Sequence, residues 1–168
     1  FRDKVAEHTE QLRRVCRYLK AWRDHHWRDG GGPTSVSIMI AVAQTFEPQR
    51  GRDDLALEKA ARILAAAIPQ ELREPGIDGG SEDFNSRLSP EEKAIASRKA
   101  EALAEALQQA RIRAVHQKSE AITHVQAHLG ERIPNRPDLV EADSGAESIR
   151  SVPARQVVPP VVPATSAG

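Results

Sequence analysis

Apolar residues recur every three or four positions along this chain, and glycine and proline interrupt that spacing at a few points. Between residues 2 and 28 the spacing marks one face of a long amphipathic helix. The apolar positions of that face are Val5, Leu12, Val15, Cys16, Leu19 and Trp22. Residues 30–32 are glycines and Pro33 follows them. The helix is expected to end there, because neither residue type sustains a helix cheaply.

Two more helices are expected before residue 70. Thr34 or Ser35 can cap the first of them by accepting a backbone N–H. Residues 36–46 are apolar on nearly every face, which predicts that they form the most buried element of the chain. Asp53 is expected to cap the second helix, which runs to Ile68.

A sharp helix start follows a polar loop at residues 75–88. Ser89-Pro90-Glu91-Glu92 places a capping serine, a proline at the first helical position and a glutamate three residues after the cap. This pattern is a capping box. The apolar spacing continues to Leu129, so residues 89–129 form one helix or two, and Gly130 is the expected left-handed terminator.

The composition changes beyond Leu139, where serine, alanine, glycine and proline become frequent. Residues 141–168, which end in a run of valines and prolines, are predicted to form a disordered or polyproline-like tail. Residues 1–140 are predicted to form one all-α domain, a helical bundle.

The charge balance limits the classes of partner. The chain has 24 lysine and arginine residues against 24 aspartate and glutamate residues, so no DNA partner is predicted. Cys16 is the single cysteine, and no segment approaches the roughly 18 apolar residues of a membrane span. A soluble, cytoplasmic protein is expected. The start at Phe1, without a methionine or a signal peptide, suggests a cut inside a longer protein.

Five short segments occur in an order and at a spacing that carry a family resemblance. They are residues 17–23 (RYLKAWR), 33–39 (PTSVSIM), 53–57 (DDLAL), 83–89 (DFNSRLS) and 129–139 (LGERIPNRPDL). Together they resemble the carboxy-terminal, helical half of bacterial cGAS/DncV-like nucleotidyltransferases, which are relatives of the oligoadenylate synthetases. The resemblance covers roughly residues 12–140.

The resemblance implies a two-lobed enzyme that joins ribonucleoside triphosphates into a second messenger of antiphage defence. The amino-terminal lobe of such enzymes carries a Gly-Ser motif and the acidic residues that bind two magnesium ions. This chain has neither, so the fragment alone is expected to be inactive, with Mg²⁺ bound by the missing lobe. A free-standing helical protein-interaction module is the alternative function.

No catalytic residue is predicted in the chain itself. The acidic pairs Asp53-Asp54 and Glu91-Glu92 stand at helix starts, where carboxylates meet the positive end of the helix dipole. Two-metal catalysis requires carboxylates that hold ions about 4 Å apart, and adjacent helical residues point in different directions. Both pairs are therefore interpreted as helix-stabilising residues.

Lys20 and Ser35 are the predicted nucleotide-binding residues. The resemblance implies that the lysine of a Lys-x-Trp segment reaches the triphosphate and that a residue soon after the next proline contacts phosphates. Arg13, Arg17 and Lys20 also fall on one side of the first helix, because they are spaced by four and three. The alternatives are a solvated surface charge for Lys20 and a plain helix cap for Ser35.

Further candidates are less specific. Arg17 is a possible nucleotide-binding residue, and Asn85 and Arg87 either contact a nucleobase or brace their own loop. His124 and His128 lie one helical turn apart, but no third ligand accompanies them, so no metal site is predicted. His25 and His26 are expected to be exposed near the end of the first helix.

The carboxyl terminus suggests a partner. The resemblance includes synthases that operate with ubiquitin-transfer-like enzymes, which join the synthase's carboxyl end to a target, and others that operate with peptide-clasping HORMA proteins. The small terminal residues Ala167 and Gly168 suit the narrow channel of a conjugating enzyme. An extended apolar run also suits strand addition to a partner's sheet. Gly168 is the predicted conjugation or partner-binding position, and a tail without any partner is the alternative.

Overall fold

The computed structural model describes residues 9–49 and 51–140. Within those ranges the chain is helical and contains no strand, as the apolar spacing predicts. Residues 1–8 of the predicted first helix and the predicted tail, 141–168, lie outside the described residues. The α-helices are α2 (Thr9–His26), α3 (Ser35–Thr45), α4 (Asp53–Ala67), α5 (Pro90–Ala114) and α6 (Lys118–Leu129). The short 3-10 helices are η1 (Asp78–Gly80), η2 (Gly130–Arg132) and η3 (Pro137–Leu139).

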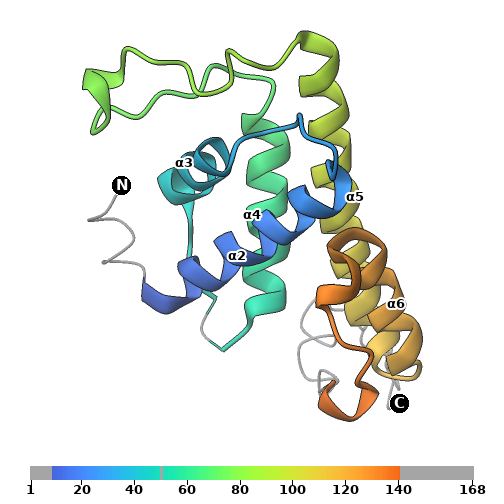
Figure 1. Ribbon diagram of the computed structural model, residues 1–168. Helices are drawn as coiled ribbons and strands as arrows, with labels where there is room; N and C mark the ends of the chain where they lie inside the picture. Colours follow the sequence, from blue (N-terminus) through green and yellow to red (C-terminus); the bar gives the residue numbers. More distant parts are fainter. Residues whose placement is uncertain (1–8, 50, 141–168) are drawn as a thin grey trace, which may run out of the picture.

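The bundle is built on the pair α4 and α5, which lie side by side (Figure 1). Helix α2 crosses α4, and α6 packs back along α5. The loop of residues 69–88 joins α4 to α5 and extends beyond α3. None of the described helices is long and apolar enough to cross a membrane.

Helix α2 buries the apolar face that its spacing predicts. Leu12, Val15, Leu19 and Trp22 are fully buried, and truncation of a buried leucine or tryptophan to alanine typically costs about 2–5 kcal/mol. The helix ends before three glycines with positive φ. At Gly32, with φ of 67°, an added Cβ would lie 2.5 Å from the ring of Trp27, so only glycine fits this turn.

Helix α3 is capped by Thr34, whose Oγ1 accepts a 3.0 Å hydrogen bond from the backbone N–H of Ser37. Ser35 is therefore the first helical residue and its hydroxyl is not used as the cap. Six of the eleven residues of α3 are buried, against six of fifteen in α4. Among the described helices α3 therefore has the largest share of buried residues, as predicted, although Val36 is 44% exposed.

Asp53 does not cap α4. The N-cap residue is Arg52, which makes no side-chain cap hydrogen bond, and Asp53 is the first residue of the helix. Its carboxylate instead accepts hydrogen bonds of 2.9 Å from Arg14 Nη2 and Gln11 Nε2 on α2. These bonds, with that of Arg14 the strongest, hold the pKa of Asp53 below its usual value. Because Asp53 binds Arg14 on α2, it does not act as the predicted cap of α4.

The capping box at the start of α5 is confirmed. Ser89 Oγ accepts a 3.2 Å hydrogen bond from the backbone N–H of Glu92, and the Glu92 carboxylate accepts one of 2.8 Å from the N–H of Ser89. The stretch to Leu129 consists of two helices, because α5 ends at Ala114 and α6 begins at Lys118. Gly130 ends α6 with φ of 73° and ψ of −168°, a positive φ with a more extended ψ than a left-handed helical residue has.

Candidate functional site

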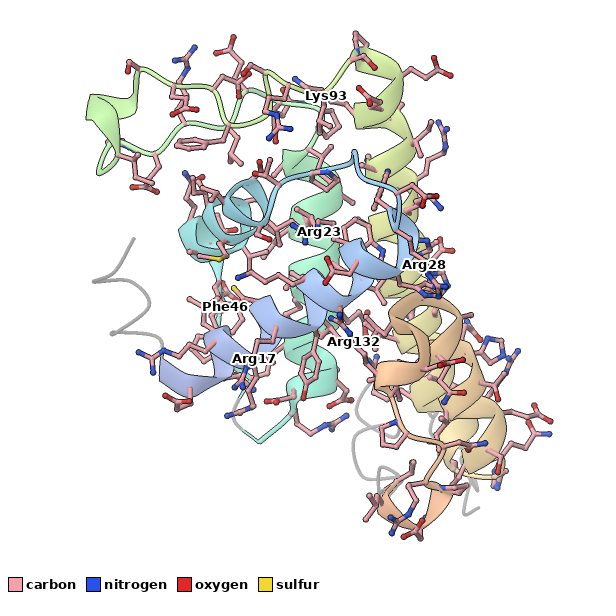
Figure 2. All side chains as sticks on the ribbon, in the orientation of Figure 1. Arg17, Arg23, Arg28, Phe46, Lys93 and Arg132 are labelled. Carbon is pink, nitrogen blue, oxygen red and sulfur yellow. The ribbon has the colours of Figure 1, made fainter. Side chains whose placement is uncertain are left out.

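The predicted basic stripe lies on α2. Arg13 is paired with Glu10, whose Oε1 lies 2.7 Å from Arg13 Nη1. Arg17 is exposed and Lys20 is half-buried, and among the described residues neither has a hydrogen-bond or ion-pair partner. Figure 2 shows Arg17 beside the amino-terminal half of α2. Two of the three cations of the stripe are therefore available to an anion.

Ser35 is connected to the same side of α2 through Arg23. The Nη1 atom of Arg23 donates a 2.6 Å hydrogen bond to Ser35 Oγ at the start of α3. Arg23 follows Lys20 by three residues on α2, and residues at this spacing are neighbours on a helix surface. Arg23 thus contacts Ser35 directly and lies about one helical turn from Lys20.

Asp24 orients two guanidinium groups at the end of α2. Its Oδ1 accepts hydrogen bonds of 3.0 and 2.5 Å from Arg23 Nε and Nη2, and its Oδ2 accepts one of 3.3 Å from Arg132 Nη1 in η2. The bonds from Arg23 are the main cause of a lowered pKa for Asp24. The carboxylate therefore stays ionised and joins the end of α2 to the segment after α6.

A cavity of about 590 Å³ opens beside Arg23. We call it the arginine pocket, because four arginine side chains line it: Arg23, Arg28, Arg87 and Arg132. Figure 2 labels three of them around the carboxyl-terminal half of α2. Its other lining residues are Asp24, Trp27, Gly30, Gly31, Gly32, Pro33 and Thr34.

The sequence alone does not predict that these arginines share one pocket. A signal was present, because Arg87 and Arg132 stand inside the segments 83–89 and 129–139 that carry the family resemblance. However, 45 positions separate these two arginines in the chain, and no local pattern indicates that they meet. Only the tertiary fold, in which α6 and η2 pack against α2, places both of them beside Arg23 and Arg28.

Asn85 is buried, with only 1% of its surface exposed. Its Nδ2 lies 3.3, 3.2 and 3.0 Å from the carbonyl oxygens of Ala67, Ile68 and Gln70. The amide therefore satisfies carbonyl groups at the end of α4, which have no partner within the helix. Of the two alternatives raised from the sequence, this geometry is that of a loop brace.

His26 is not exposed as expected but half-buried between aromatic rings. Its ring lies 5.9 Å from those of Trp22, Trp27 and His128, measured between centroids. Burial and the nearby charge of Lys99, whose Nζ lies 3.2 Å from His26 Nδ1, lower the pKa of His26 to about 4. The neutral imidazole thus joins α2 to α5 and α6.

The described part of the chain contains no group of three or more histidine, cysteine, aspartate or glutamate side chains placed to hold a metal ion. Asp53 is engaged by Arg14 and Gln11, and Asp54 is paired with Arg52 at 2.8 Å. Mg²⁺ requires several oxygen ligands around one position. These residues do not fit the magnesium site that the family resemblance implies for a whole enzyme.

The arrangement of helices has close counterparts among solved structures. The crystal structure of DncV cyclic AMP-GMP synthase from Vibrio cholerae, described as a prokaryotic cGAS homologue, matches with a TM-score of 0.70 and 25% identity. The match covers 84% of this chain and 38% of that one. The fold is therefore that of the helical part of a cGAS/DncV-like nucleotidyltransferase.

The family follows from the sequence comparison. The family model described as "Cyclic GMP-AMP synthase, C-terminal domain" matches residues 9–142, which is most of the chain. The chain belongs to this family of cyclic GMP-AMP synthase C-terminal domains. The fold class and the family resemblance inferred from the five sequence segments are both confirmed.

Curated relatives extend beyond this chain. The cyclic GMP-AMP synthase of Vibrio cholerae serotype O1 is 32% identical over 149 residues, which are 84% of this chain and 33% of the relative. The chain thus spans about a third of the length of that relative. A further structure, of a Vibrio cholerae DncV mutant, is described as a complex with ATP, GTP and 5MTHFGLU2. It matches with a TM-score of 0.69 and 26% identity, over 84% of this chain and 37% of that one.

Proposed function

We propose that this chain is the nucleotide-holding helical part of an enzyme that joins ribonucleoside triphosphates into a second messenger. The observation that carries the proposal is the family match over residues 9–142. The related DncV structure described with ATP and GTP supports triphosphates as substrates. The complete reaction extends beyond the third of the relative's length that this chain spans.

In this proposal Lys20 and Ser35 orient one triphosphate. Lys20 supplies a mobile positive charge on α2, and its ammonium has no hydrogen-bond or ion-pair partner among the described residues. Ser35 Oγ accepts a hydrogen bond from Arg23, which leaves the hydroxyl proton available to a phosphate oxygen. Ser35 also stands in the first turn of α3, where free backbone N–H groups favour an anion. Arg17, one turn before Lys20, is a further possible contact.

The chain's part in the reaction is to position phosphates and compensate their charge. Phosphoryl transfer depends mainly on such positioning and on electrostatic stabilisation. We assign Mg²⁺ to the amino-terminal lobe of such enzymes, as the family resemblance implies. When bound there, the metal would neutralise charge on the phosphate oxygens. By itself the chain is expected to lack synthase activity.

We further propose a role in cytoplasmic antiphage defence, with Gly168 as the point of contact for a ubiquitin-transfer-like or HORMA partner. The support is the family resemblance and the small terminal residues Ala167 and Gly168. Gly168 and the rest of the predicted tail lie outside the described residues.

A biochemical assay tests the proposed function. The complete reading frame that encodes the chain is expressed, and the purified product is incubated with labelled ATP and GTP and Mg²⁺. We expect phosphatase-resistant products that contain new phosphodiester bonds. If no product forms and the reading frame encodes no Gly-Ser and Asp-x-Asp motifs before Phe1, the result favours the alternative function, a free-standing helical interaction module.

A further inference from the structure

The arginine pocket holds more positive than negative charge. Four arginines and a single acidic residue, Asp24, line it. The arginines come from segments that are distant in sequence: Arg23 and Arg28 from α2 and the turn after it, Arg87 from the loop before α5, and Arg132 from η2. Because like charges repel, the gathering of four guanidinium groups in one cavity is costly unless an anion shares it.

Two of these arginines lack any protein partner. Arg28 and Arg87 are exposed, and within the described ranges neither makes a hydrogen bond or an ion pair. Arg23 and Arg132 already share the carboxylate of Asp24. After this partial neutralisation, about three positive charges remain for a ligand. Arg28 and Arg87 therefore supply N–H donors that have no acceptor among the described residues.

We propose that the arginine pocket binds an oligophosphate, a chain of two or three linked phosphates. Guanidinium groups bind phosphate through paired N–H donors, and their weak hydration lowers the cost of removing water. A pyrophosphate or triphosphate group carries several negative charges on one compact chain, which matches several converging arginines better than a single carboxylate does. The cavity of about 590 Å³ also has room for such a group.

The wall of glycines suits the same ligand. Residues 30–32 have no side chains and form one side of the pocket, so a phosphate can approach the backbone closely. The ring of Trp27 fixes this wall, because it occupies the space where a Cβ of Gly32 would lie. The ligand thus meets a firm backbone surface on one side and long arginine side chains on the others.

This site does not include Lys20 and does not depend on the proposed function. It adjoins the Ser35 position through Arg23, which donates to Ser35 Oγ and also lines the arginine pocket. Two sources of an oligophosphate fit the chemistry: free pyrophosphate, or the phosphates of a nucleoside triphosphate. A titration with each of them separates the sources.

The test is isothermal titration of sodium pyrophosphate into the 168-residue chain and its variants. Arg28→Gln and Arg87→Gln are each expected to raise the Kd about tenfold, since each removes one charged hydrogen-bonding group. The double variant is expected to bind pyrophosphate with a Kd about a hundredfold higher, if the free-energy effects of the two substitutions add. Arg98→Gln is the matched control, because Arg98 is exposed, is also without a hydrogen-bond partner among the described residues, and lines a different cavity.

A parallel titration with ATP identifies the source. Weaker binding of both ligands to the Arg28 and Arg87 variants supports a site that also receives nucleotide phosphates, and weaker binding of pyrophosphate alone supports free pyrophosphate. Absence of pyrophosphate binding at low salt, or equal affinity of both variants and the unaltered chain, overturns the proposal. Lys20→Ala serves as a separate variant: the arginine pocket predicts unchanged pyrophosphate affinity for it, whatever becomes of the proposed function.

Discussion

Arg23 Nη1 donates a 2.6 Å hydrogen bond to the hydroxyl oxygen of Ser35, across the junction between α2 and α3. The same guanidinium is paired with Asp24 on its other edge. The guanidinium of Arg23 therefore orients both Asp24, the acidic residue of the arginine pocket, and Ser35, which we propose contacts a triphosphate. The orientation of Ser35 therefore depends on Arg23, the last residue of the segment 17–23 that carries part of the family resemblance.

Arg23→Lys is expected to weaken triphosphate binding about tenfold, on the scale of one lost charged hydrogen bond. Lysine keeps the charge but cannot reach Asp24 and Ser35 at the same time, because it lacks the planar fork of arginine. Titration of ATP into the protein measures the effect, with Arg98→Lys as the control. Equal affinities for Arg23→Lys and the unaltered protein would remove Arg23 from the site.

Asn85→Ala is expected to lower the free energy of unfolding by about 2–3 kcal/mol. The substitution removes the Asn85 donor from the carbonyl groups of Ala67, Ile68 and Gln70, and the loss is costly where the carbonyl is buried, as at Ile68. Urea unfolding followed by circular dichroism measures the change, with the exposed neighbour Ser86→Ala as the control. Unchanged stability together with weaker nucleotide binding would instead favour the base-contact alternative.

Local sequence rules predict a helix end correctly where neighbouring residues alone form the cap. The capping box at Ser89 depends only on groups within one turn of the chain, and it is present. The rules were wrong where a distant partner competes. Asp53 is bound to Arg14, 39 positions away, and therefore does not cap its helix. The same limit explains why the arginine pocket was not foreseen.

The stability of the protein is expected to fall between pH 6.5 and about 4 through His26. Its pKa is lowered from 6.5 to about 4 on folding, chiefly by burial. The folded state therefore binds fewer protons than the unfolded state in this window, and stability rises with pH across it. The contribution is complete above pH 6.5 and lost as the pH approaches 4.

His26→Gln tests this dependence, because glutamine does not titrate. Urea unfolding across the same pH range is expected to show a smaller loss of unfolding free energy in the variant. The difference is on the order of 1–2 kcal/mol after allowance for the partial exposure of His26. Some slope will persist, since burial also lowers the pKa of His128. A variant with the same slope as the unaltered protein would contradict the burial of a neutral His26.

Deletion of residues 142–168 is expected to abolish any covalent attachment or partner binding at Gly168. Co-expression with the neighbouring genes, followed by mass spectrometry, detects an amide or isopeptide bond at the terminal carboxylate. Extension of the chain by one residue beyond Gly168 is the matched control for a conjugating enzyme, because it blocks the terminus and keeps the tail. If deletion changes neither conjugation, partner binding nor phage resistance, the partner proposal is wrong.

The most direct test of the central claim, that this helical part holds a nucleoside triphosphate through Lys20, is a titration of ATP and GTP into the Lys20→Ala variant. Lys59→Ala is the matched control, because Lys59 is an exposed lysine on α4, 3.9 Å from Glu47. The account predicts a tenfold to hundredfold loss of affinity for Lys20→Ala, about 1.5–3 kcal/mol, with unchanged unfolding and no loss for Lys59→Ala. Equal triphosphate affinity in the two variants and the unaltered protein would contradict it.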